Sequence, residues 1–143
     1  MKKKILIALM LAAGSLALPV SASPFDGAQP LICASTEILE CIPGAGCNRV
    51  TAESIDAPQF IRIDFSANEL SAERVGGGTK VSTIERSETV DGKLMLQGAE
   101  DGVEGVRDGL GWTLAIAQET GKMSLTASGD EVGFVIFGAC TAM

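Results

Sequence analysis

The sequence predicts an all-β fold, a small antiparallel up-and-down barrel of about eight strands, with a two-sheet β-sandwich as the alternative. Short segments of alternating apolar and polar residues recur along the chain, and glycine-containing turns separate them. The alternation is clearest in residues 110–140, where one face would carry Trp112, Leu114, Ile116, Met123, Leu125, Phe134 and Ile136. Three antiparallel strands with one buried face follow from this pattern. A barrel this narrow is filled by its own side chains or holds one small ligand.

Residues 1–22 are predicted to be a secretory signal peptide. Three lysines follow Met1, an apolar run extends from Ile5 to Leu18, and small residues at Val20 and Ala22 favour cleavage after Ala22. A transmembrane anchor needs about 20 apolar residues, so no membrane span is expected. The prediction is therefore an exported protein, periplasmic or secreted, with a single barrel domain over residues 23–143.

The four cysteines all lie in the predicted mature chain. An even number of cysteines in a small exported domain predicts two disulfides, and three pairings can be drawn. We favour Cys41–Cys47, which closes a short loop, and Cys33–Cys140, which ties the first strand to the last. A zinc site is the weaker alternative because the spacing lacks paired C-x-x-C motifs. The predicted barrel is thus braced by disulfides.

The first half of the mature chain is expected to contain three strands and one constrained loop. A polar lead-in comes first, and Pro43 with two glycines argues against regular structure in the loop. A single helical turn is expected before Pro58. In order, the segments are the lead-in Ser23–Pro30, strand Leu31–Leu39, loop Cys41–Arg49, helical turn Thr51–Ile55, strand Gln59–Phe65 and strand Glu69–Arg74.

The second half begins with a loop tip at Gly76–Gly78, because three glycines lose too much entropy inside an element. A solvent-exposed strand is expected over Lys80–Val90, which is rich in β-branched residues. Asp91-Gly92 predicts a hairpin turn into strand Lys93–Gln97. An acidic, glycine-rich connection over Ala99–Gly109 then leads to the last three strands.

Glu37 interrupts the alternation of the first strand. If Cys33 faces the interior, Glu37 would face it too unless a β-bulge intervenes or the disulfide points outward. The bulge or outward disulfide is favoured. The other interpretation is a carboxylate that faces a cavity, where desolvation would raise the pKa of Glu37 and mark a site.

The sequence carries no recognisable catalytic motif, and a non-enzyme is predicted. It has no histidine, which excludes Ser-His-Asp and Cys-His nucleophile pairs and every histidine-ligated metal site. Paired carboxylates could still support hydrolysis, with Glu37 or Glu53 as members. The acidic cluster in the long connection is expected to be a solvated loop, with weak cation binding as the lesser alternative; its members are Glu100, Asp101, Glu104 and Asp108. No cofactor and no metal are predicted.

Charge narrows the range of partners. The whole chain has a net charge of −7, and without Lys2, Lys3 and Lys4 its 11 basic residues fall to eight against 18 acidic ones, a net charge of −10. Nucleic acid and anionic lipid are both attracted by basic residues. The sequence therefore predicts no nucleic-acid partner.

Three residues are candidates for binding. Trp112 is the single tryptophan and is expected to plug one end of the barrel, or else to face a ligand. Glu37 is a candidate if it faces a cavity. Arg62 is the third, although a surface pair with a nearby carboxylate is its simpler role.

A resemblance rests on the string from Cys33 through Cys47, on Pro58-Gln59-Phe60 and Gly111-Trp112, on Thr120-Gly121, and on the ending Phe137-Gly138-Ala139-Cys140-Thr141. With these features most of the mature chain resembles a family of small exported bacterial proteins of uncharacterised function. The motifs are turns, cysteines and core positions, so the resemblance implies no activity and no functional residues.

The sequence therefore predicts an exported, non-enzymatic binding module. Its partner would be a small apolar ligand in the barrel interior or another protein, and the loop closed by Cys41 and Cys47 suits a protein contact because rigid loops lose less entropy on binding. The alternatives are a carboxylate-based hydrolase and a structural envelope protein without a small ligand.

Overall fold

The structure is a computed structural model that describes residues 23–74, 76–102 and 104–143. The predicted signal peptide, residues 1–22, lies outside the described residues. Regular structure in the described ranges consists of ten strands and one short 3₁₀ helix. These are β1 (Leu31–Ile42), β2 (Gly46–Val50), η1 (Glu53–Ile55), β3 (Phe60–Asp64), β4 (Glu69–Glu73), β5 (Thr79–Thr83), β6 (Arg86–Val90), β7 (Lys93–Glu100), β8 (Leu110–Ala117), β9 (Lys122–Gly129) and β10 (Val132–Ala142).

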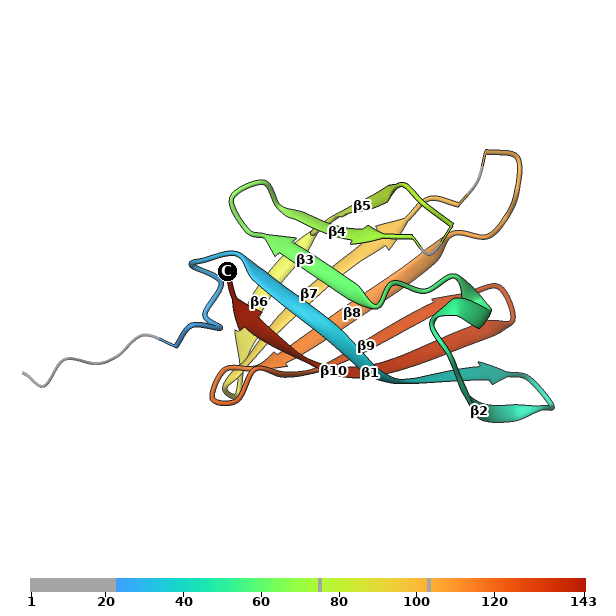
Figure 1. The fold of residues 1–143 in the computed structure, drawn as a ribbon, viewed down its shortest axis with the longest axis horizontal. Helices are drawn as coiled ribbons and strands as arrows, with labels where there is room; N and C mark the ends of the chain where they lie inside the picture. The colour runs from blue at the N-terminus through green and yellow to red at the C-terminus, as the bar shows by residue number, and fades with distance from the viewer. Residues whose placement is uncertain (1–22, 75, 103) are drawn as a thin grey trace, which may run out of the picture.

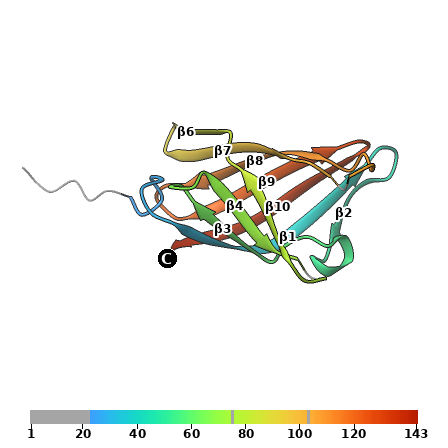
Figure 2. The same ribbon diagram turned by 90° about the horizontal axis from the view of Figure 1, so that it is seen from above.

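Nine of the strands form one continuous antiparallel sheet in the order β5-β4-β3-β1-β10-β9-β8-β7-β6, and β2 pairs with β1 beside it. The first and last long strands, β1 and β10, are neighbours in the middle of this order. The sheet curls into a half-barrel, so that β3, β4 and β5 lie across the strands drawn in yellow and orange in Figure 1, and Figure 2 shows the same curl from above. The prediction of an all-β antiparallel barrel is confirmed.

Both predicted disulfides are present. Cys33 of β1 and Cys140 of β10 lie directly opposite each other in the strand register, with an S–S distance of 2.05 Å. Cys41 and Cys47 lie opposite each other between β1 and β2, with an S–S distance of 1.98 Å. Disulfides persist in oxidising surroundings, so the two bridges suggest an extracellular environment. The Cys33–Cys140 bridge spans the centre of the sheet, while the sheet's edges are β5 and β6.

The segment predicted as an irregular loop, Cys41–Arg49, is instead a regular hairpin. Strand β1 continues to Ile42 and β2 begins at Gly46, so only Pro43–Ala45 lie outside the strands. Gly44 and Gly46 both have a φ of 79°, which glycine adopts without steric cost. The glycines therefore tighten the turn and leave both cysteines in the paired strands.

The segment Lys80–Val90 was predicted as one strand, and this is wrong. It forms β5 and β6, separated by Ile84 and Glu85. The side chain of Ile84 is buried, and its N–H donates to the Asn68 carbonyl at 2.8 Å, while the N–H of Glu85 donates to the Gln97 carbonyl at 2.9 Å. The chain thus bends at Ile84, because burial of that side chain and these bonds draw it from one edge of the sheet to the other.

One end of the half-barrel is packed solid. Six side chains in this region are completely inaccessible to solvent: Leu31, Cys33, Ile63, Leu96, Leu114 and Ile116. The predicted polar lead-in contributes Phe25, which packs against the core. A Cβ at Gly121, where φ is 69°, would overlap the Phe25 ring. The lead-in therefore covers this end of the interior. No helix in the described ranges is long and apolar enough to cross a membrane.

Candidate functional site

The other end of the interior is hollow. A cavity of about 260 Å³ lies where β7 ends and β8 begins. Its wall is mainly apolar and draws on both halves of the curled sheet: Ile61 of β3, Leu70 of β4, Trp112 of β8, Leu125 of β9, and Phe134 and Ile136 of β10. Ile55, the last residue of η1, and residues 56–58, which lead to β3, also line the cavity. Ligand sites in proteins are typically concave and mostly apolar in this way.

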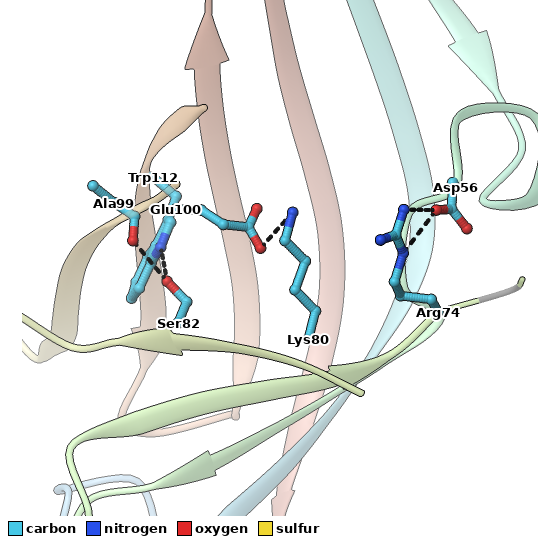
Figure 3. A network of polar contacts seen from close by, with 7 residues as sticks. All are labelled: Asp56, Arg74, Lys80, Ser82, Ala99, Glu100 and Trp112. Atoms are coloured by element: carbon cyan, nitrogen blue, oxygen red, sulfur yellow. Dashed lines mark hydrogen bonds and ion pairs between the residues drawn. The ribbon is translucent and has the colours of Figure 1, made fainter. Parts of the chain in front are cut away.

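Trp112 belongs to the wall of this cavity and is held there by a short hydrogen-bond chain. Its ring nitrogen Nε1 donates to the hydroxyl oxygen of Ser82 at 2.8 Å, and that hydroxyl donates to the carbonyl oxygen of Ala99 at 3.0 Å. Ser82 is buried on β5, and Ala99 lies on β7. These two hydrogen bonds therefore link β5, at one edge of the sheet, to β7 and β8 across the interior (Figure 3).

Gly98 makes room for this arrangement. It lies opposite Trp112 in the β7–β8 register. A Cβ at this position would overlap both the Trp112 ring and the backbone carbonyl oxygen of Thr83. Any larger residue would thus push either the indole ring or β5 away from β7.

Two ion pairs lie at the mouth of the cavity. Lys80 Nζ on β5 is 2.8 Å from Glu100 Oε1 at the end of β7. Arg74 donates to Asp56 Oδ2 through Nε at 3.0 Å and through a terminal nitrogen at 2.5 Å. The exposed fractions of the Lys80, Arg74 and Asp56 side chains are 41%, 48% and 41%, whereas that of Glu100 is only 20%. Figure 3 shows the two ion pairs side by side.

The mouth has an excess of negative charge. A third carboxylate, Glu73, lies at the rim between the cavity and the depression on the outer face, where it accepts a hydrogen bond from the Thr79 hydroxyl at 3.1 Å. The pKa of Arg74 is raised above its ordinary value, chiefly by the hydrogen bond to Asp56 and the charge of that carboxylate, and further by the charges of Glu100 and Asp108. Arg74 therefore lies in a field set by several carboxylates.

The three predicted candidates are not brought together. Trp112 lies in the cavity wall. Glu37 lies on the outer face because the register of β1 shifts between Ser35 and Glu37, as the predicted bulge requires. The cavity-facing interpretation of Glu37 is wrong, since its carboxylate pairs with Arg49 at 2.6 Å across the β1–β2 hairpin.

Arg62, the remaining candidate, is exposed on β3 and lies away from the cavity. Its Nη1 is 3.4 Å from the sulfur of Met143. It lines a separate depression on the outer face together with Phe60 and Glu53.

Sequence reasoning missed most of the polar residues of the site, which are Asp56, Glu73, Arg74, Lys80, Ser82 and Glu100. Lys80 and Ser82 alternate along one strand, which was the available signal that they share a face. That signal was lost because Lys80–Val90 was interpreted as a single solvent-exposed strand.

The carboxylates proposed for hydrolysis, Glu37 and Glu53, line another depression on the outer face. Glu53 accepts a hydrogen bond from Gln59 Nε2. The pKa of Glu53 is lowered, first by a hydrogen bond from its own backbone N–H and then by the Thr51 side chain. A general acid needs a raised pKa, so Glu53 fits that role poorly. Within the described ranges, no group of three or more acidic or cysteine side chains is arranged to hold a metal ion.

Comparison of the chain with protein-family models, with curated proteins and with solved structures finds no match.

Proposed function

We propose that this chain is an exported, non-enzymatic binding protein that holds a small, largely apolar ligand in the hollow end of its half-barrel. The observation that carries the proposal is the cavity of about 260 Å³, with Trp112 in its wall, beside a region of the same core that is packed solid. Pockets for drug-sized ligands occupy roughly 300–1,000 Å³. The ligand is accordingly a small one.

Export is part of this proposal. The two disulfides support it, because structural disulfides are rare in reducing compartments. The predicted signal peptide and the resemblance to a family of small exported bacterial proteins remain predictions.

Native mass spectrometry of the protein purified from its own host compartment tests the proposal. We expect a small-molecule adduct that disappears when the protein is denatured. Ala127→Leu on β9 would fill the cavity, since Ala127 lines it, and should abolish the adduct. Thr126→Leu is the matched control, because the neighbouring Thr126 is exposed and lies on the opposite face of the strand. An adduct that survives Ala127→Leu would place the ligand elsewhere.

Binding to the purified protein can be followed directly. Trp112 is the only tryptophan, so its fluorescence reports on the cavity wall without interference. Hexan-1-ol, a small uncharged amphiphile, should change this fluorescence saturably in the native chain and in Thr126→Leu, but not in Ala127→Leu. No saturable change up to the solubility limit, together with no adduct, would refute the proposal.

A protein contact through the β1–β2 hairpin is a second candidate function. The hairpin extends beyond the rest of the sheet at one end of the molecule (Figures 1 and 2). Ile42 at its turn is 45% exposed, and the Cys41–Cys47 disulfide braces it. A photo-crosslinking residue in place of Asn48 should capture a discrete partner in the host compartment, whereas one in place of Lys122, on β9, should not. Equal labelling at the two positions would argue against a hairpin-specific contact.

A further inference from the structure

The side chains in the deep part of the cavity offer a ligand no hydrogen-bonding group that lacks a partner. Trp112 Nε1 and the Ser82 hydroxyl are already bonded in the chain that ends at the Ala99 carbonyl. In the described part of the chain, no buried side-chain nitrogen or oxygen lacks a hydrogen-bond partner. A polar group pushed to this depth would lose its bonds to water without replacement. The part of the ligand that enters the cavity is therefore apolar.

The charged side chains at the mouth of the cavity lie next to the part of the ligand that stays outside it. The mouth carries two cationic side chains, Arg74 and Lys80, each already paired with a carboxylate at 3.0 Å or less. An anionic ligand can use the remaining donors of Lys80 and Arg74, just as a cationic ligand can use the remaining acceptor sites of the carboxylates. The two ion pairs therefore do not by themselves decide the sign of the ligand's charge.

The balance of charge at the mouth favours a cation. Three carboxylates line the cavity, those of Asp56, Glu73 and Glu100, against two cations. The raised pKa of Arg74, to which Asp108 also contributes, agrees with a negative potential at this edge. Over the whole of residues 23–143, 18 acidic side chains face only eight basic ones. A field of this sign attracts cations to the mouth and repels anions.

We propose that the ligand is a small amphipathic cation, an amine with a short alkyl or aryl body, whose apolar part fills the cavity while its ammonium group rests among Asp56, Glu73 and Glu100 at the mouth. This inference rests on the proposed function and adds the charge and shape of the ligand class. The ammonium group stays at the surface, where it keeps part of its hydration.

A matched series of three ligands tests the inference: hexylamine, hexan-1-ol and hexanoate share one apolar chain and differ only in head group. Near pH 7 the amine is charged, since alkylammonium groups titrate near the lysine value of about 10.4. Titrations followed by Trp112 fluorescence at low ionic strength should rank the amine tightest, the alcohol next and the carboxylate weakest. One unit charge at about 4 Å in water is worth about fivefold in affinity, so each step should be about fivefold or more.

Salt and a charge variant supply independent readouts. Raising the ionic strength should narrow the gap between amine and carboxylate and leave the affinity of hexan-1-ol nearly unchanged. Glu73→Gln removes one carboxylate at the mouth without breaking either ion pair, and it should weaken only the amine, by about fivefold. Glu85→Gln, at an exposed site between β5 and β6 that does not line the cavity, is the matched control and should change none of the three affinities.

The outcomes separate this inference from the proposed function. Hexanoate binding as tightly as hexylamine or tighter, with Ala127→Leu abolishing both, would overturn the cationic ligand while supporting a ligand-binding cavity. Equal binding of all three ligands, without salt dependence, would do the same. Binding of none of them would overturn this inference, and together with the absence of an adduct in native mass spectrometry it would overturn the proposed function as well.

Discussion

The two disulfides provide a test of what stabilises the curled sheet. Cys33 and Cys140 are separated by 107 positions in the chain, and Cys41 and Cys47 by only six. A cross-link restricts the unfolded chain by an entropy that grows with the logarithm of the loop it closes. At 25 °C this amounts to about 4.8 kcal/mol for the long loop and about 2.2 kcal/mol for the short one.

Core packing should increase the difference between the stabilising effects of the two disulfides. Cys33 is fully buried and Cys140 is 8% exposed, whereas Cys47 is exposed in the hairpin. Replacement of the first pair by alanine removes sulfur atoms from the core as well as the cross-link. We therefore expect Cys33→Ala/Cys140→Ala to lose at least about 2.5 kcal/mol more unfolding free energy than the matched double variant Cys41→Ala/Cys47→Ala.

Urea unfolding followed by Trp112 fluorescence under non-reducing conditions measures both losses. Domains of this kind have a total stability of roughly 5–15 kcal/mol, so the long-loop variant should be close to unfolding in water. Circular dichroism would show whether its strands persist. Equal losses in the two double variants would refute the loop-entropy reasoning, and a larger loss from the hairpin pair would show that the β1–β2 hairpin organises the fold.

Two further predictions concern single side chains. Ser82→Ala removes the hydrogen-bond partner of Trp112 Nε1 and of the Ala99 carbonyl. It should lower the unfolding free energy by about 2–3 kcal/mol and shift the fluorescence emission of Trp112 to longer wavelength. Unchanged emission would contradict a role of Ser82 in holding the indole ring. Hydrogen bonds from the Ser66 hydroxyl and the Ala67 N–H lower the pKa of Asp64 below its ordinary value of 3.8. The ionised Asp64 carboxylate therefore stabilises the folded protein above pH 3.8, and this contribution is lost as the pH falls through the folded-state pKa. Asp64→Asn should therefore destabilise the protein at pH ~6 and progressively less as the pH falls below 3.8, measured by urea midpoints, and a loss that does not change with pH would contradict this.

Much of the fold could be predicted because its signals are local. Alternation placed Leu114 and Ile116 in the core, and a count of cysteines with their positions indicated both bridges. The Asp91-Gly92 turn forms as expected, with both residues at positive φ. The conflict between Cys33 and Glu37 in the first strand predicted either a β-bulge or an outward disulfide, and the structure has the bulge.

The errors arose where local signals conflict with tertiary pairing. Proline and glycine in the segment Cys41–Arg49 suggested a loop, yet pairing with β1 made most of it a strand. No local pattern predicts the bend at Ile84, because it depends on a buried side chain and on hydrogen bonds to Asn68, in the turn between β3 and β4, and to Gln97 of β7.

The sequence by itself determined that the chain folds as an antiparallel β structure with two disulfides, because alternation and cysteine spacing are properties of neighbouring residues. The tertiary structure alone decided that one end of the interior is packed and the other hollow. Alternation states which side chains point inward, but the space left between them depends on how far the sheet curls. That curl brings β5 beside β7, and with it Lys80 to Glu100 and Ser82 to Trp112, pairs of residues that no local pattern connects.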